Sequence, residues 1–211
     1  MRCIILSNGE YGDLEAYRKI FRDDDIIVCA DGGANYAYKM GLIPDTIIGD
    51  MDSILPEVRK FFAARNVVMK KYPRQKDFTD TQLALTIGLE WKATEILMLG
   101  SLGGRLDHAI CNLYCSMDIV KNNIKITYFT PDCWVYVVDR EVIINGSRGD
   151  IVSILTLTQE ARGVSVTGCK YCLDKVLLEK GNPYTISNVL TGKTGKISLE
   201  EGIILVFHYH N

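Results

Sequence analysis

Apolar residues in the first part of the chain follow two alternating patterns. Short apolar runs, typical of strands, occupy residues 3–6, 26–30, 46–48, 67–71, 95–99 and 125–130. Segments with helical spacing lie between them, at residues 14–21, 35–40, 56–64, 79–91 and 106–120. The helix at 79–91 opens with a capping-box pair, Thr79 and Gln82. This alternation predicts a mostly parallel sheet flanked by helices on both faces.

The pattern changes after Pro131. Short runs typical of strands follow at residues 134–138, 141–144, 151–157, 164–167, 176–178, 196–199 and 203–208, and Gly, Asn and Ser punctuate them. No helix is expected after Lys121. We therefore predict an α/β plus all-β protein, with an α/β domain over residues 1–131 and a β-sandwich over residues 132–211.

Composition and charge narrow the function. The formal net charge is −2 and no long basic run occurs, so nucleic acid is not an expected partner. No apolar stretch approaches the roughly 20 residues that a membrane helix needs, and the first residues have no signal-peptide layout. The seven cysteines are an odd number and are scattered, which fits a reducing compartment. We expect a cytoplasmic protein that does not bind membranes.

Carboxylates gather in the loops that follow the predicted parallel strands. These loops contain Asp31, the segment 49–53, the segment 76–80 and the segment 100–108. Ligands of open α/β sheets bind at the carboxyl ends of the strands, so the four loops are expected to converge. Converging carboxylates repel one another unless a cation lies between them. Oxygen ligands at this density suit Mg²⁺.

The glycine turn at residues 103–104 adds a site for anions. It feeds a helix, whose first N–H groups are available to a phosphate. Arg105 can bind phosphate oxygens with two nitrogens, and Lys76 adds a second cation. Together with a metal, these groups describe a polyphosphate site. Each acid alone has a plainer explanation, because Asp31 or Asp50 could serve a turn and Asp77 or Asp80 a helix start.

One pair of cysteines, Cys169 and Cys172, has the spacing of a zinc or redox motif. A zinc site would need a second such pair or nearby histidines, and the chain has three histidines in all. The pair also falls in a β-rich region, whereas the redox motif accompanies a βαβ pattern. We therefore interpret the two cysteines as packing residues.

Four segments resemble thiamine pyrophosphokinases, in the order and with the spacing of that family. They are DGGAN at residues 31–35, GDMDS at 49–53, KDFTD at 76–80 and GGRLDH at 103–108. In the tail, GCKYCL at 168–173 and the pair Ser187-Asn188 are similar to further family segments, although Cys169, Tyr171 and Cys172 depart from the usual residues there. The resemblance covers nearly the whole chain.

The resemblance implies transfer of pyrophosphate from ATP to the hydroxyethyl group of thiamine, giving thiamine diphosphate and AMP. It implies Mg²⁺, an α/β catalytic domain, a thiamine-binding sandwich and a homodimer with active sites at the subunit interface. The implied catalytic acids are Asp50, Asp52, Asp77, Asp80 and Asp107. Of these, Asp50, Asp52 and Asp80 would hold metal. The implied nucleotide-site residues are Asp31, Gly32, Lys76, Gly104 and Arg105. The implied thiamine-site residues are Tyr171, Ser187 and Asn188.

Three points stay open at this stage. Asp77, Asp80 or Asp107 could accept the proton of the thiamine hydroxyl group. A metal-dependent phosphatase could use the same acids on water, but it would not need a second domain with an aromatic pocket. A protein that binds thiamine diphosphate without catalysis would not need the full set of acids.

Overall fold

The computed structural model describes residues 1–75 and 77–210. The chain divides into two compact units. The first comprises Met1–Cys115 with Tyr128–Pro131, and the second comprises Ser116–Thr127 with the residues from Asp132 onwards. Helix α5 (Leu106–Lys121) and strand β6 (Lys125–Thr130) contribute residues to both units.

The first unit contains a parallel sheet. Its strands are β1 (Arg2–Leu6), β2 (Ile26–Ala30), β3 (Thr46–Gly49), β4 (Val68–Lys71) and β5 (Glu95–Leu99). They run in the order β5-β1-β2-β3-β4, and every neighbouring pair is parallel. β1 is buried along its whole length, which explains its continuous apolar run. The predicted parallel sheet is therefore confirmed.

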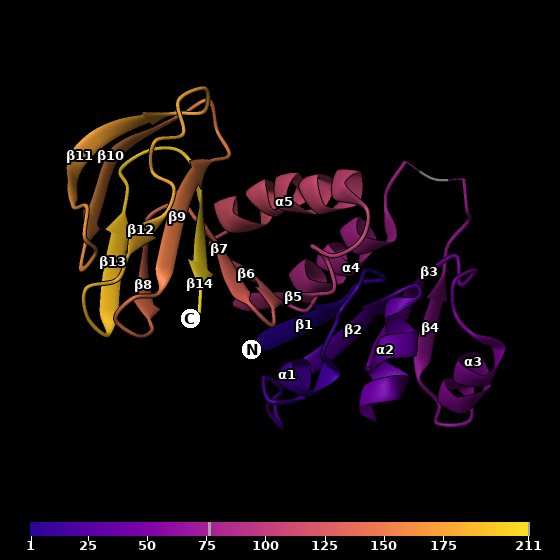
Figure 1. Ribbon diagram of the computed structural model, residues 1–211. Helices are drawn as coiled ribbons and strands as arrows, with labels where there is room; N and C mark the ends of the chain where they lie inside the picture. The colour runs from indigo at the N-terminus through magenta and orange to yellow at the C-terminus, as the bar shows by residue number, and fades with distance from the viewer. Residues whose placement is uncertain (76, 211) are drawn as a thin grey trace. The chain divides into compact units, whose positions relative to one another are not determined.

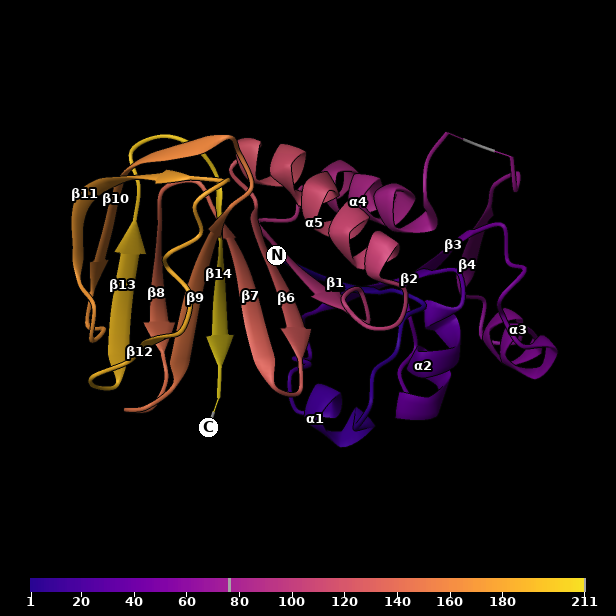
Figure 2. The same cartoon turned by 45° about the horizontal axis from the view of Figure 1, so that its top comes forward.

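Helices connect these strands and cover the sheet. They are α1 (Leu14–Arg18), α2 (Gly33–Met40), α3 (Pro56–Ala63) and α4 (Asp80–Glu90). Figure 2 shows α2 and α4 on opposite faces of the sheet, as the alternation predicted. The capping box of α4 is confirmed, because the Thr79 side chain accepts from the Gln82 N–H and the Gln82 side chain accepts from the Thr79 N–H. α1 is shorter than the predicted 14–21, since it ends at Arg18.

The second unit is a sandwich of two antiparallel sheets (Figure 1). Its strands are β7 (Cys133–Val138), β8 (Glu141–Asn145), β9 (Ile151–Thr156), β10 (Glu160–Thr167), β11 (Leu173–Glu179), β12 (Asn188–Val189), β13 (Thr194–Ser198) and β14 (Ile204–Tyr209). In one sheet the strands of this unit lie in the order β12-β9-β14-β7, and the other sheet has the order β11-β10-β13-β8. Buried residues of both sheets, among them Ile154, Val166 and Val206, form one core. The predicted sandwich is confirmed, and only the two-residue strand β12 was not foreseen.

Helix α5 is the longest helix of the described chain and it carries Asp118 and Lys121 in its later turns. Among the described residues, no helix has both the length and the apolar character needed to cross a membrane.

Candidate active site

Three carboxylates meet at the carboxyl ends of β2 and β3. Asp31 directly follows β2, and Asp50 and Asp52 follow β3. One oxygen of each lies within 4.8 Å of an oxygen of the other two. Asp31 is buried, whereas Asp50 is partly exposed and Asp52 exposed. The parallel-sheet rule thus brings together the acids that sequence placed in separate loops.

The backbone of these loops is shaped to hold the acids close. Asp31 has φ 44° and Met51 has φ 67°, a left-handed conformation that few side chains adopt readily. The Asp31 N–H donates to the carbonyl of Ile48 at 2.8 Å. The Asp52 N–H donates to Asp50 Oδ1 at 3.1 Å, so the loop satisfies part of its own negative charge. Such strain at a functional loop persists only where the surrounding structure enforces it.

The side chain of Asn35, the last residue of the DGGAN segment, fastens the loop after β3. Its Nδ2 donates to the carbonyl of Ser53 at 2.9 Å, and its Oδ1 accepts from the Leu55 N–H at 3.0 Å. We call this contact the Asn35 clamp. It links α2 to the loop that carries Asp50 and Asp52, so Asn35 positions acids that it does not touch.

Asp80 approaches the same acids from the start of α4. Gly49 makes this possible, because its φ is 143° and a Cβ there would lie 2.9 Å from Asp80 Oδ1 and 3.0 Å from the Cβ of Asp31. Any side chain at position 49 would therefore press on two of the predicted site acids. Asp80 is partly exposed and is the first residue of α4.

These acids line a cavity of about 710 Å³ in the first unit. The lining comes from the loops after all five parallel strands and from the start of α5. It includes Arg74, whose Nε lies 3.5 Å from Asp52 Oδ2, and the glycine turn that precedes Arg105. The predicted site residues among the lining are Asp31, Asp50, Asp52, Asp80, Gly104 and Arg105. Such a cavity is large enough for a nucleotide and combines acids with two guanidinium groups.

Three further predicted residues of the first unit, among those that the structure describes, do not line the cavity. Asp107 forms a two-point ion pair with Arg105, with Nε–Oδ1 at 3.1 Å and Nη2–Oδ2 at 2.6 Å, and does not line the cavity. This hydrogen bonding lowers the pKa of Asp107 to about 2. Asp77 is exposed and Gly32 is buried, and neither residue lines the cavity. Lys76 lies outside the described residues.

Several lining residues were not predicted. Ser7 and Asn8 follow β1, and Ser7 Oγ lies 3.0 Å from Ser101 Oγ in the loop after β5. The side chain of Asn8 packs on Gly32, where a Cβ would lie only 2.3 Å from it. The signal was present, since the sequence ends its first strand at Ser7-Asn8-Gly9. Their side chains carry no charge, so a pattern of carboxylates and cations does not single them out.

The predicted thiamine-site residues lie in the second unit. The Tyr171 side chain is 60% exposed. Asn188 holds its backbone at two points, because Oδ1 accepts from the Tyr171 N–H at 3.0 Å and Nδ2 donates to the Tyr171 carbonyl at 2.7 Å. We call this contact the Asn188 clamp. Ser187 has φ 61° and donates its N–H to Ser153 Oγ at 2.9 Å. Structure thus joins Tyr171 and Asn188, which are 17 positions apart in sequence.

Cys169 and Cys172 flank this loop as free cysteines. Cys169 is buried in the sandwich core, and burial raises the pKa of its thiol. Cys172 is exposed, and its thiol donates to the Cys169 carbonyl at 3.3 Å. The packing interpretation thus fits Cys169 directly.

Two family models match the chain. One describes the thiamin pyrophosphokinase catalytic domain and matches residues 17–128. The other describes the thiamin pyrophosphokinase vitamin B1 binding domain and matches residues 140–204. The two matches lie one after the other along the chain and together cover most of it.

Individual proteins agree with these models. A thiamine pyrophosphokinase of Bacillus subtilis is 29% identical over 178 residues, covering 83% of each chain. Thiamine pyrophosphokinase 1 of rice is 27% identical over 210 residues, covering 87% of this chain and 79% of the relative. The crystal structure of the Bacillus subtilis enzyme is similar with a TM-score of 0.88 at 27% identity, covering 100% of both chains. That of Geobacillus thermodenitrificans has a TM-score of 0.87 at 25% identity, covering 100% of this chain and 98% of the other.

Proposed function

The chain belongs to the thiamin pyrophosphokinase family, and from this we propose how its residues divide the work of the reaction. Its activity is that of a thiamine pyrophosphokinase, which transfers pyrophosphate from ATP to the hydroxyethyl group of thiamine and produces thiamine diphosphate and AMP. The observation that carries the proposal is the meeting of Asp31, Asp50 and Asp52 in one cavity. Residues 1–131 would perform the transfer, and residues 132–211 would bind thiamine.

Asp31, Asp50 and Asp52 would hold Mg²⁺. The donor set fits this ion, because it consists of carboxylate oxygens that lie within 4.8 Å of one another. When bound, the ion would neutralise phosphate charge as the bond to the leaving AMP breaks. The family resemblance implied Asp80, and not Asp31, as the third metal ligand. Asp80 lines the same cavity, and we assign it a different role.

Arg105 and Arg74 would bind the phosphates, because their guanidinium groups are positively charged. Both line the cavity, and the N–H groups around Gly104 are the kind of donors that phosphate oxygens accept. Lys76 remains a predicted third cation. Asp107 keeps the Arg105 guanidinium in a fixed orientation through its two-point contact.

We propose Asp80 as the proton acceptor. The thiamine hydroxyl group attacks the β-phosphorus of ATP and loses its proton, which needs a carboxylate within reach of the cavity. Of the three acids left open by sequence, Asp80 lines the cavity, whereas Asp77 and Asp107 do not. Most of the rate enhancement would come from positioning and charge neutralisation.

Tyr171 would stack on thiamine. Its exposed ring presents an aromatic face, and the thiazolium ring of thiamine is a cation that such a face attracts. The match to a vitamin B1 binding domain covers this segment. Asn188 would keep the ring in place through the clamp on its backbone, and Ser187 would shape the adjoining turn.

The product analysis is the first test. Purified protein with Mg-ATP should release AMP only when thiamine is added, and one thiamine diphosphate should form for each AMP. ADP as the product would mean transfer of a single phosphate and would contradict the assignment of pyrophosphate transfer. AMP without thiamine would indicate hydrolysis instead.

The homodimer with active sites at the subunit interface is a proposal with its own test. Asp52→Asn and Tyr171→Ala would each inactivate a different part of the site. If each site draws on both subunits, mixing the two variants after dissociation should restore about a quarter of the wild-type activity, because about half of the random dimers carry one intact site of two. No restored activity in confirmed mixed dimers would place each site within one chain.

A cytoplasmic location completes the proposal. None of the cysteines that the structure describes forms a disulfide bond, which agrees with a reducing compartment. Cell fractionation with antibody detection would test the location.

A further inference from the structure

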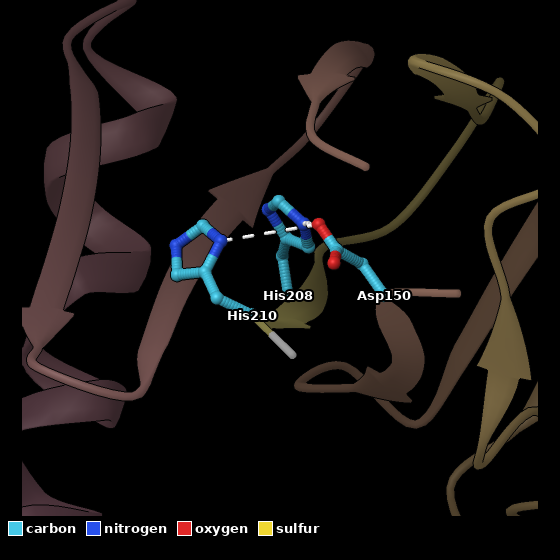
Figure 3. A group of neighbouring side chains, drawn as sticks. All are labelled: Asp150, His208 and His210. Atoms are coloured by element: carbon cyan, nitrogen blue, oxygen red, sulfur yellow. Dashed lines mark hydrogen bonds and ion pairs between the residues drawn. The ribbon is translucent and has the colours of Figure 1, made fainter. Parts of the chain in front are cut away.

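A second cluster of metal-ligating side chains lies in the second unit, within the sheet that contains β9 and β14. It consists of Asp150 directly before β9, His208 in β14 and His210 just after it. Figure 3 shows the carboxylate and the two rings gathered at one point. Asp150 and His208 are buried, whereas the His210 side chain is 40% exposed.

The distances within the cluster are short. His208 Nε2 lies 2.8 Å from Asp150 Oδ2, and His210 Nδ1 lies 3.9 Å from the same oxygen (Figure 3). The two imidazole rings are 4.6 Å apart between their centroids. One atom of each of the three side chains lies within 4.8 Å of the others. Ligand atoms on a four-coordinate zinc ion are separated by about 3.3 Å, so small side-chain shifts suffice to bind one ion.

One atom of the cluster has no partner. His208 Nδ1 is fully buried and makes no hydrogen bond within the part of the chain that the structure describes. Buried polar atoms in native proteins are nearly always paired, so an orphaned imidazole nitrogen requires an explanation. A histidine ligand binds its metal ion through one nitrogen and keeps the other for a hydrogen bond, so an ion bound at this cluster would change the pairing of both His208 nitrogens.

The loop before Asp150 packs closely on these atoms and holds them in place. A Cβ on Gly146 would lie 2.4 Å from Asp150 Oδ2 and 2.7 Å from His208 Nε2, so no side chain could stand there. The Ser147 N–H donates to Asp150 Oδ2 at 2.9 Å and holds the carboxylate in place. The His210 N–H donates to the Asp132 carbonyl at 3.3 Å, which fixes the third residue.

We propose that Asp150, His208 and His210 form a binding site for a divalent transition metal of the zinc type. Two imidazole nitrogens and one carboxylate suit zinc better than Mg²⁺, which prefers oxygen alone. The exposed side of His210 leaves a fourth position for water. The ion would join the start of β9 to the end of β14, which pair in register at Ile151 and Tyr209, and so stabilise the second unit.

The test uses the full-length protein, freed of metal with EDTA and kept in excess MgCl₂ so that the acidic cluster of the first unit is saturated. ZnCl₂ is titrated against a chromophoric zinc chelator. We expect one zinc ion per chain. His210→Ala and Asp150→Asn should each weaken this binding about 10- to 100-fold. His108→Ala, which removes the histidine of the first unit, is the matched control and should leave zinc affinity unchanged.

Two further measurements distinguish zinc bound at Asp150, His208 and His210 from zinc bound elsewhere. Zinc should raise the thermal midpoint of wild type but not that of His210→Ala, a variant expected to fold because its side chain is partly exposed. Bound Co²⁺ should show visible absorption bands without a thiolate charge-transfer band. Absence of zinc binding would overturn the proposal and leave a buried Asp–His hydrogen bond. Zinc binding that survives both variants, or a thiolate band, would place the ion on cysteines and overturn it equally.

Discussion

Each unit uses one asparagine side chain to hold a loop that carries predicted site residues. In the first unit, Asn35 binds the backbone at Ser53 and Leu55. In the second, Asn188 binds both backbone groups of Tyr171. The chemistry is the same in both cases, because an amide offers one donor and one acceptor side by side.

What the two clamps restrain is different. The Asn35 clamp holds a loop on which carboxylates are brought together against their mutual repulsion. The Asn188 clamp holds an exposed aromatic ring that would otherwise sample many orientations. We infer that loss of the first clamp should mainly reduce turnover, whereas loss of the second should mainly weaken binding of thiamine.

The largest effect should come from removing a charge that the first clamp positions. Asp52→Asn should lower kcat about 100- to 1,000-fold, because a ligand to the phosphate-neutralising ion is lost. The thermal midpoint should stay the same or rise, since repulsion among the acids is relieved. Asp23→Asn, at an exposed turn away from the cavity, is the control. Near-normal AMP production with normal Mg²⁺ dependence would remove Asp52 from the mechanism.

The next effect should come from the first clamp itself. Asn35→Ala should lower kcat about 10- to 100-fold by letting the loop after β3 shift. The Mg²⁺ concentration for half-maximal rate should rise, which a purely structural role elsewhere would not cause. Asn35→Asp keeps the acceptor for the Leu55 N–H and should recover part of the activity. An unchanged Mg²⁺ requirement in Asn35→Ala would contradict a positioning role.

A smaller effect is expected from the second clamp. Asn188→Ala should raise the KM for thiamine about five- to tenfold with kcat and the KM for ATP nearly unchanged, because the freed Tyr171 must be ordered on binding. Tyr171→Phe keeps the aromatic face and should bind thiamine nearly as well as wild type, whereas Tyr171→Ala should not. If Asn188→Ala lowers kcat as strongly as Asn35→Ala does, the contrast between the clamps is lost.

The smallest effect concerns Asp107 and Arg105. Asp107→Asn should raise the KM for ATP about fivefold with little change in kcat, since Arg105 loses its orienting partner. A fall in kcat by orders of magnitude would instead place Asp107 on the substrate.

The same ion pair has a predictable pH dependence. The pKa of Asp107 is lowered from 3.8 to about 2 in the folded protein. A lowered carboxylate pKa contributes stability above the ordinary value, and this contribution is lost as the pH falls through the folded value. At pH values above 4, the thermal midpoint of wild type should therefore be slightly higher than that of Asp107→Asn. The two midpoints should converge as the pH falls to about 2. A difference that persists at pH 2 would contradict this origin.

Sequence could predict the loops of the first unit because one topological rule fixes them. Parallel strands bring their carboxyl ends to one edge, so Asp31, Asp50 and Asp52 had to converge once the strands were identified. The capping box at Thr79 is likewise local and was readable from spacing. The family segments then supplied the reaction.

Sequence could not predict which way side chains turn within those loops. Arg105 and Asp107 are two positions apart, and nothing in that spacing says that they bind each other. Asn35 has no charge, so its contact with Ser53 gave no signal. Asp150 and His208 are separated by 58 positions, and only the register of β9 and β14 brings them together.

The contact between Asn8 and Gly32 has a consequence for protein engineering. The Asn8 side chain occupies the space in which any larger residue at position 32 would need room, so the loops after β1 and β2 interlock. A loop taken from a relative would have to fit against the other loop of this chain, which has not been exchanged with it. Chimeras that exchange residues 7–10 should be soluble and active only when residues 31–35 come from the same donor, so the smallest exchangeable module of this site is two loops.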